Sequence, residues 1–217
     1  MEAATGLARP PLAALLEERL HLPGGRAVLL RPITPGDARA AQDFVGALSL
    51  DARHQRFHVG LRRLSPALLR QLTEVDPQTH VALVALQLQP ATEAPRLVAD
   101  ARYVRSSERP GEAEFAIAVA DDWQSLGLGR GLMARLAAHA RQAGLRALFG
   151  DVLVQNRRML VLMQGLGARL RPHPDGPQLA RAVFDLAALG ETPAAAVQDP
   201  TLADLAGPAG ARRRPIG

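Results

Sequence analysis

The sequence predicts one domain of the mixed α+β, or α/β, class, built around a mostly antiparallel sheet. Segments rich in Val, Ala and Leu lie between proline and glycine turns and alternate with segments that have helical spacing. Their order is strand, helices, three strands, helix, strand, helix and two strands. The 217 residues are 47% hydrophobic, which suits one domain with a core. We expect an N-terminal extension (1–25), the domain (26–187) and a flexible C-terminal tail (188–217).

The first elements are short and have clear start signals. Residues 12–20 are amphipathic and suit an extension or a packing helix. Residues 27–31 predict a strand that Pro32 ends. Caps, prolines and acidic residues that favour helix N-termini then predict three helices. These helices run over 34–48, 49–57 and from 65 to about 72.

The middle of the chain predicts an antiparallel meander of three strands. The strands are His80–Leu88, Leu97–Val104 and Glu112–Val119, with turns at Pro90–Pro95 and Arg109–Gly111 between them. Apolar residues then recur every four positions from Leu128 to Ala140, which predicts an amphipathic helix ending near Gly144. The remaining elements are a strand over 147–154, a helix over 156–165, and strands over 167–171 and 178–186.

Composition excludes several classes of protein. The chain has no cysteine, which excludes disulfides, thiolate zinc sites and cysteine nucleophiles, and fits a reducing compartment such as the cytoplasm. All 26 basic residues are arginine, so the chain lacks the lysine of a P-loop and of a pyridoxal-phosphate enzyme. We expect no secretory signal and no membrane span. The net charge of +5 leaves an acidic partner open, but an aromatic content of 3% argues against a nucleic-acid stacking platform.

The segment 124–130, Gln-Ser-Leu-Gly-Leu-Gly-Arg, joins a strand to the long amphipathic helix. Such a junction directs main-chain N–H groups and the helix dipole at one point, and its glycines let a phosphate approach closely. We therefore predict an anion site for a pyrophosphate. A dinucleotide motif would need glycine in place of Leu132, and a serine-hydrolase elbow would need it in place of Trp123. The glycines alone leave open a turn that merely joins the two elements.

The same segment carries a family resemblance. Gln124–Gly129 matches the Q/R-x-x-G-x-G/A motif of the GNAT acetyltransferases, Asn156 matches the family's asparagine, and Leu166-Gly167 its Leu-Gly-Phe ending. The resemblance spans about residues 26–187. It implies the GNAT fold, with a mostly antiparallel sheet of six to seven strands, splayed between the fourth and fifth, and about four helices.

Four segments further resemble the catalytic domain of bacterial Pat-type protein lysine acetyltransferases. They are Leu48–Phe57, Leu64–Leu69, Ala113–Gln124 and Gly150–Leu160. Such proteins often carry a regulatory domain that these segments do not include. Regulation by that domain in cis is therefore not carried over.

The resemblance implies acetyl-CoA as co-substrate. The amides of 124–130 would bind its pyrophosphate, the strand edge at 117–119 its pantetheine arm, and Asn156 the pantetheine or the reaction centre. The implied coenzyme-binding residues are Ile117, Ala118, Val119, Gln124, Ser125, Leu126, Gly127, Leu128, Gly129, Arg130 and Asn156.

Glu114 is the implied catalytic base. It alternates with Ala116 and Ala118, so small residues flank it on one strand face; a surface glutamate at a strand end is the alternative. Glu112 shares the face and is the reserve candidate. We expect direct transfer of the acetyl group, since no cysteine can carry it.

Two other residue types bear on the chemistry. Many GNAT enzymes use a tyrosine as acid where this chain has Met163, so solvent is expected to protonate the thiolate. His54 and His58 could share a helix face, but Gln55 breaks the metalloprotease motif. A polar helix surface is the default interpretation, and lining the substrate entrance is the better functional one. We expect no metal.

The acceptor stays open at this point. A primary amine on a protein lysine and a small-molecule amine both fit. A non-catalytic acyl-CoA sensor and an arginine-rich nucleic-acid binder are the alternatives from other classes.

Overall fold

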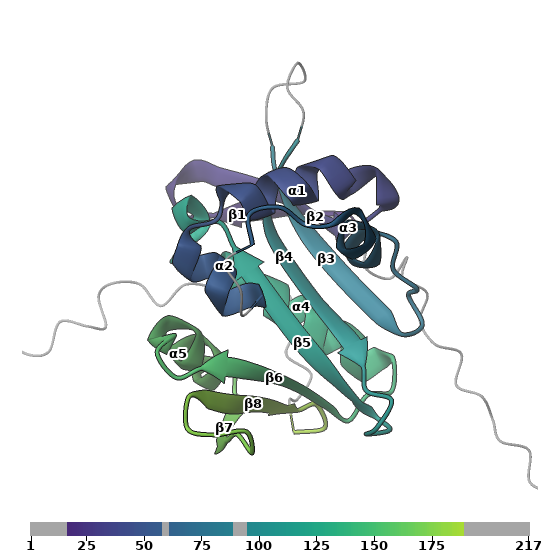
Figure 1. Cartoon of the computed structure of the whole chain (residues 1–217), viewed down its shortest axis with the longest axis vertical. Coiled ribbons are helices and arrows are strands. Elements are labelled where there is room, and N and C mark those ends of the chain that lie inside the picture. The colour runs from purple at the N-terminus through teal and green to yellow at the C-terminus, as the bar shows by residue number, and fades with distance from the viewer. Residues whose placement is uncertain (1–16, 58–60, 89–94, 189–217) are drawn as a thin grey trace, which may run out of the picture.

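An eight-stranded sheet organises the chain in the computed structural model, which describes residues 17–57, 61–88 and 95–188 (Figure 1). The strand order is β1-β2-β3-β4-β5-β6-β8-β7, and every neighbouring pair is antiparallel except β5 with β6. The strands are β1 (Glu18–Leu22), β2 (Arg26–Pro32), β3 (His80–Gln87), β4 (Arg96–Arg105), β5 (Glu112–Val119), β6 (Ala147–Leu153), β7 (Arg169–Pro172) and β8 (Leu179–Asp185).

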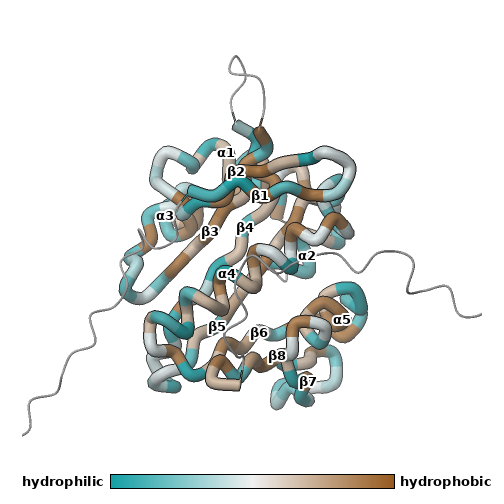
Figure 2. Tube along the Cα trace, turned by 180° about the vertical axis from the view of Figure 1, so that it is seen from behind, coloured by the Kyte–Doolittle hydropathy of each residue, from teal (hydrophilic) through white to brown (hydrophobic). Residues whose placement is uncertain are grey.

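Helices cover both faces of the sheet. The α-helices in the described residues are α1 (Ala38–Ala47), α2 (Leu50–Phe57), α3 (Pro66–Thr73), α4 (Leu128–Gln142) and α5 (Arg157–Gly165). Helices α1 to α3 lie on one face and α4 on the other, while α5 packs beside β7 and β8 (Figures 1 and 2). Figure 2 shows hydrophobic residues along the central strands, where Val81 to Leu86 of β3 are all buried. The predicted mixed α/β class is confirmed.

The N-terminal edge of the sheet differs from the sequence prediction. Glu18–Leu22 is strand β1, paired with β2 from Glu18↔Leu30 to Leu22↔Arg26, so the helix predicted over 12–20 is wrong at its described end. Alternating burial along β1 fits an edge strand, a pattern that the amphipathic reading of its leucines missed. This strand raises the count to eight, and the described helices number five. Residues 1–16, and the predicted tail from residue 189 onward, lie outside the described residues.

The predicted helix starts are confirmed by their caps. Thr34 and Asp37 form a capping box ahead of α1, and the Ser65 hydroxyl accepts a hydrogen bond from the Leu68 amide at 3.2 Å. The predicted end of the long helix is also present: Gly144, just after α4, has the left-handed φ of +76° that ends many helices. None of the described helices combines the length and apolar character needed to cross a bilayer.

The sheet opens between β5 and β6. These parallel strands pair only from Glu112↔Ala147 to Glu114↔Phe149 and separate beyond that point. Just past the last pair, the Phe115 ring fills the space over Gly150, where an added Cβ would lie 2.7 Å from its Cζ. The predicted splay is therefore present, and it separates the two halves of the sheet beside the 124–130 loop.

Candidate active site

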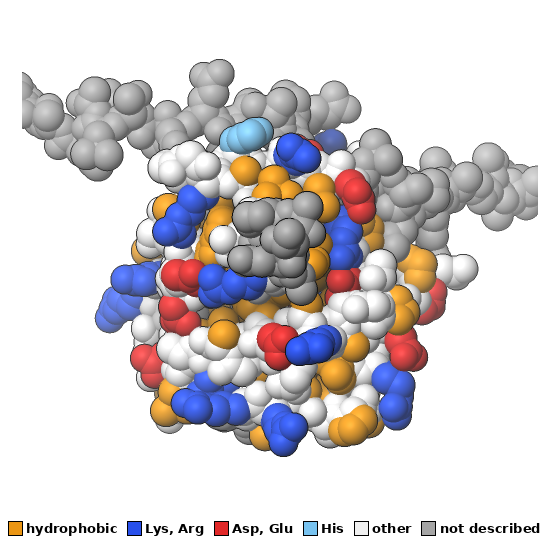
Figure 3. Space-filling view, turned by 90° about the horizontal axis from the view of Figure 1, so that it is seen from above, with side chains coloured by type: hydrophobic (Ala, Val, Ile, Leu, Met, Phe, Trp, Pro, Cys, Tyr) orange, Lys and Arg blue, Asp and Glu red, His pale blue; other side chains and the backbone are white. Residues whose placement is uncertain are grey.

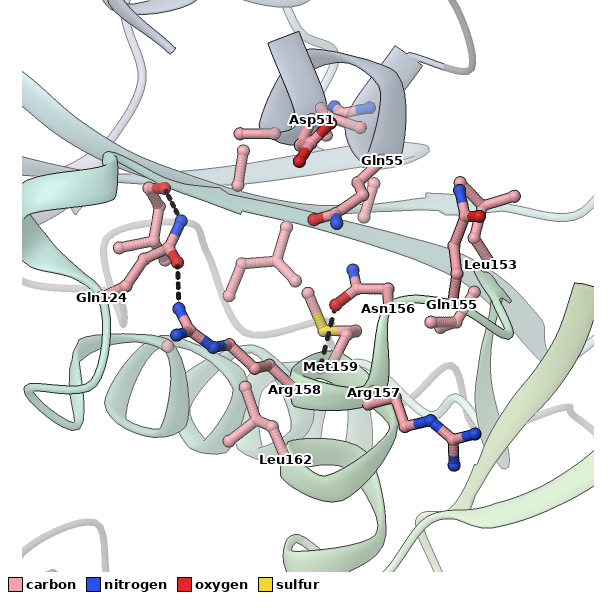
Figure 4. Close-up of a pocket in the computed structure, with 18 of the residues that line it drawn as sticks. Asp51, Gln55, Gln124, Leu153, Gln155, Asn156, Arg157, Arg158, Met159 and Leu162 are labelled. Atoms are coloured by element: carbon pink, nitrogen blue, oxygen red, sulfur yellow. Dashed lines mark hydrogen bonds between the residues drawn. The ribbon is translucent and has the colours of Figure 1, made fainter. Parts of the chain in front are cut away.

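A cleft of about 1400 Å³ begins where β5 and β6 separate (Figure 4). Its walls are α2, the exposed end of β5, the loop before α4, the end of β6, the start of α5 and part of the segment 173–179. The walls thus come from segments far apart in the sequence. The splay of the sheet is what brings them together.

The loop before α4 presents a row of main-chain donors. Ser125 has φ +61° and Gly127 has φ +81°, and these left-handed turns lead the chain into the helix. Within the described part of the chain, the N–H groups of residues 125–130 donate no hydrogen bond to another group. Free N–H groups at the positive end of a 15-residue helix suit an anion such as a phosphate.

Gln124 fixes this loop against its neighbours. Its Nε2 donates to the Val119 carbonyl at 3.2 Å, and its Oε1 accepts from Arg158 Nη1 at 3.3 Å (Figure 4). The side chain thereby joins the end of β5 to the start of α5. Its role is to hold the two cleft walls in place.

The edge of β5 is available to a ligand. The Ala120 N–H donates to the Val98 carbonyl of β4 at 2.8 Å. Because main-chain groups of successive strand residues face opposite edges, those of Ile117 and Val119 face away from β4 and into the splay. The Val119 carbonyl accepts from Gln124, and the other main-chain groups of this edge are suited to a ligand that carries amide groups, as pantetheine does.

Asn156 starts α5 and also lines the cleft. Its Oδ1 accepts from the Met159 amide at 3.1 Å, which makes it the helix cap. The side chain points across the cleft toward Gln55 on the opposite wall (Figure 4). Its amide nitrogen has no hydrogen-bond partner among the described residues and is free to donate to a ligand.

Glu114 is exposed on β5 and lines the cleft, whereas Glu112 does not. The Glu112 carboxylate lies 3.8 Å from Arg109 on the outer side of the strand end. Ala116 and Ala118 follow Glu114 on the same face and also line the cleft. The geometry therefore favours Glu114 over the reserve candidate.

Most of the implied coenzyme-binding residues share this cleft. Leu126 and Leu128 are the exceptions, because their side chains pack into the core and only their amides face the loop. His54 is exposed on α2 and is not among the lining residues, while His58 lies outside the described residues. No cluster of three or more His, Asp or Glu within the described ranges could hold a metal ion.

Sequence reasoning missed an acidic network on the other wall. Asp151 of β6 accepts two hydrogen bonds from Arg181 of β8, at 2.7 and 2.8 Å, and lies 2.9 Å from His173 Nε2. Burial raises the pKa of the Asp151 carboxyl, but Arg181 and then His173 outweigh burial and hold that pKa below its ordinary value. The direct pairing of Asp151 with Arg181 depends on the β6–β8 register, for which the sequence carries no local signal.

Three arginines surround the loop: Arg130 was among the predicted residues, whereas sequence reasoning missed Arg157 and Arg158. Arg158 and Arg157 begin α5, and Arg130 reaches the Gly165 carbonyl at 3.1 Å. All three line the cleft, and none forms an ion pair with another described residue. They leave positive charge next to the free amides, where a phosphate would gain from it.

Three comparisons bear on the identity of this cleft. The profile of the Acetyltransferase (GNAT) family matches residues 91–168. Acetyltransferase PA5475 of Pseudomonas aeruginosa is 38% identical over 154 residues, which make up 71% of this chain and 81% of that protein. Acetyltransferase Pat of Mycolicibacterium smegmatis is 33% identical over 163 residues, 75% of this chain and 47% of that protein, so the chain spans about half of that relative. The solved GNAT domain of S. lividans PAT has a TM-score of 0.69 and 28% identity, covering 78% of this chain and 96% of that one.

The fold and the cleft together define an acyl-CoA-dependent transferase. The chain belongs to the GNAT acetyltransferase family and is an N-acetyltransferase.

Proposed function

We propose that this enzyme transfers an acetyl group from acetyl-CoA to the side-chain amine of a protein lysine, in the cytoplasm. One observation carries the proposal: a single open cleft holds the free amides of 125–130 and, on the adjoining strand, the exposed carboxylate of Glu114. The volume of about 1400 Å³ exceeds the 300–1,000 Å³ usual for a small-molecule site. Room therefore remains for an acceptor beside the coenzyme.

The residues present fit acetyl-CoA along the whole loop and strand edge. The amides of 125–130, with Arg130 and Arg158, would hold the phosphates. The main-chain groups of Ile117, the Val119 N–H and the Asn156 amide nitrogen would hold the pantetheine arm. When bound, acetyl-CoA supplies the activated acetyl group.

The cleft also fits a cationic acceptor. Asp51, Glu114 and Asp175 are exposed carboxylates on three different parts of its wall. They attract an ammonium group from solvent and retain it near the strand edge. A lysine side chain is long enough to reach between them while its own backbone stays outside.

Glu114 supplies the base that the reaction needs. A lysine amine has a reference pKa near 10.4, so removing its proton at pH 7 costs about 4.6 kcal/mol. The Glu114 carboxylate accepts that proton directly or through water. The amine nitrogen then bonds to the acyl carbon as the carbon–sulfur bond breaks.

Solvent protonates the departing thiolate in this proposal. Met163 is fully buried in the core, and the single tyrosine of the chain, Tyr103, is buried on the α4 side of the sheet. The Tyr103 hydroxyl lies 2.9 Å from His139 Nδ1, away from the cleft. Met163 has no acidic proton, and Tyr103 is not placed to act as the acid.

The substitution Glu114→Gln tests the base. We expect kcat for transfer to a lysine peptide to fall by about 10²- to 10⁴-fold, with the affinity for acetyl-CoA unchanged in calorimetry. Glu108→Gln is the matched control, because Glu108 is exposed in the turn before β5 and does not line the cleft. An unchanged kcat in Glu114→Gln would contradict the assignment of this residue.

Binding and transfer assays on the wild-type protein distinguish the remaining alternatives. Binding of acetyl-CoA without transfer to any amine would support an acyl-CoA sensor, and transfer only to free polyamines a small-amine enzyme. Figure 3 shows one face of the molecule with positive and negative side chains interspersed, which argues against an extended basic surface there. A nucleic-acid binder would also lose affinity steeply with added salt.

A further inference from the structure

Arg56, at the end of α2, lies in the acceptor side of the cleft without a partner. It lines the cleft on the sheet face that carries Glu114, and its guanidinium carbon lies 4.9 Å from the centre of the Phe57 ring. Its Nε is fully enclosed and bonds to nothing. Across the described part of the chain, the Arg56 side chain makes no hydrogen bond and no ion pair.

Two other arginines, Arg102 and Arg181, have carboxylate partners, which Arg56 lacks. Arg102, under α2 and α3, bonds to both oxygens of Asp100, at distances from 2.6 to 3.2 Å, and to the Leu72 carbonyl at 3.1 Å. Arg181 forms the two bonds to Asp151 described above. The Asp100 carboxylate is thus bonded to Arg102, and it forms no hydrogen bond with Arg56.

An unpartnered cation that is half-buried, with its Nε enclosed, is costly to keep. Removing a guanidinium from water is unfavourable unless a carboxylate or carbonyl replaces the lost hydration. Burial lowers the pKa of Arg56 below that of an ordinary arginine, and the charges of Asp100 and Glu114 oppose the shift only in part. The group stays protonated at neutral pH, so the cleft contains a fixed positive charge with its hydrogen-bonding capacity unused.

We propose that Arg56 binds a carboxylate of the acceptor, so that the enzyme selects amines that have an acidic group close by, such as a lysine next to a glutamate or aspartate. This rests on the proposed function. The location favours the acceptor over the acyl group: Arg56 lies on the Glu114 side of β5, whereas the loop amides and the free edge of β5 form the coenzyme side. A planar guanidinium held against Phe57 presents its fork to a carboxylate in a defined direction.

The ammonium and the carboxylate of such an acceptor would then bind at separate places in the cleft. The ammonium meets Glu114, Asp51 and Asp175, and the neighbouring carboxylate meets Arg56. An acceptor with both groups would satisfy Arg56 on binding, and one with only the amine would leave it unpaired. The difference gives selectivity, because the cost of the unpaired cation is removed only by the correct substrate.

Matched peptides test this inference. Each pair has one lysine and differs only by Glu or Gln at a single position from −2 to +2, and kcat/KM is measured for the wild type, Arg56→Gln and Arg56→Lys. We expect the wild type to prefer the Glu peptide at one or more positions by roughly 10- to 100-fold, mainly through KM. Arg56→Gln should lose the preference, and Arg56→Lys should restore part of it.

Controls separate this role from a merely structural one. Arg39→Gln removes the same charge from an arginine that is 96% exposed on α1, and it should leave the preference unchanged. The thermal midpoint of Arg56→Gln should stay level or rise, since the substitution removes an unpaired, half-buried cation. A clear fall would indicate a structural role and overturn the proposal. Calorimetric titration of Glu and Gln peptides into CoA-saturated protein gives a second readout that needs no turnover.

The remaining outcomes are distinguishable. If the wild type acetylates peptides with equal kcat/KM for Glu and Gln at every position, the inference fails and the proposed function stands. If Arg56→Gln instead changes the choice between acetyl- and succinyl-CoA, the carboxylate belongs to the acyl group and the acceptor assignment is overturned. If the wild type acetylates no peptide and the calorimetric affinities are also equal, both proposals fail.

Discussion

The protonation state of His80, on the α1–α3 face of the sheet, is set by its neighbours. His80 of β3 lies 3.2 Å from Arg102 Nη1, and Arg102 in turn bonds to Asp100. Burial, followed by the positive charge of Arg102, lowers the pKa of His80 to about 4. The imidazole is therefore neutral in the folded protein under conditions in which an exposed histidine would be half protonated.

This shift predicts how stability depends on pH. Between about pH 4 and 6.5, an unfolded chain binds a proton at His80 that the folded chain does not bind, so the free energy of unfolding should fall as pH falls through that range. The slope should be below the one-proton limit of about 1.4 kcal/mol per pH unit, because His80 is only partly buried and solvent screens it. Urea unfolding between pH 5 and 7 measures it.

His80→Gln should make the stability curve flatter over the same range. Burial also lowers the pKa of His139, which contributes in the same direction in both proteins, so the difference between variant and wild type isolates His80. The acidic groups with lowered pKa, such as Asp37 and Asp151, lose their contribution only at lower pH. Parallel curves for the two proteins would show that His80 does not titrate as proposed.

At the scale of elements, local signals in the sequence predicted most of what holds the coenzyme side of the cleft. The loop before α4, the cap at Asn156 and the strand β5 each have their pattern within a few consecutive residues. The residues on the acceptor side of the cleft could not be predicted from such local patterns. Arg56 and Asp151 enter the cleft because α2 crosses the sheet and because β6 pairs with β8 in one register, which are long-range facts. The same reason explains β1, whose strand character depends on pairing with β2.

The two ends of α4 offer a matched test of the loop. Gly127 at its start and Gly144 after its end have φ of +81° and +76°, and an added Cβ at either position would meet no atom within 4 Å. Alanine at either position is strained only by its backbone conformation, at a cost of about 1–2 kcal/mol. We expect Gly127→Ala and Gly144→Ala to lower the free energy of unfolding by similar amounts.

Only the change at Gly127 should affect the coenzyme. Relaxing φ at this residue turns the neighbouring amides away from their common direction, so the affinity for acetyl-CoA in calorimetry should fall by about tenfold or more. Gly144 lies a helix length away and should leave the affinity unchanged. Equal affinities in the two variants would mean that the loop amides do not hold the phosphates.

At the scale of the whole molecule, the amino-acid composition prevents the enzyme from acetylating its own side chains. The proposed substrate group is a lysine amine, but the chain itself contains no lysine. All 26 of its lysine-plus-arginine residues are arginine. Guanidinium groups stay protonated at neutral pH and offer no free nitrogen lone pair for acyl transfer. The surface can thus carry many positive charges without becoming a substrate of its own active site.

Incubation with acetyl-CoA alone should therefore leave the side chains unmodified. We expect an intact mass that is unchanged, or raised by a single acetyl group on the terminal α-amino group, whose pKa near 8 leaves some of it neutral at pH 7. A lysine peptide added to the same mixture serves as the positive control for activity. Peptide mapping by mass spectrometry locates any modification, and an acetyl group on an internal side chain would show that a second nucleophile, outside the proposed mechanism, reacts with the thioester.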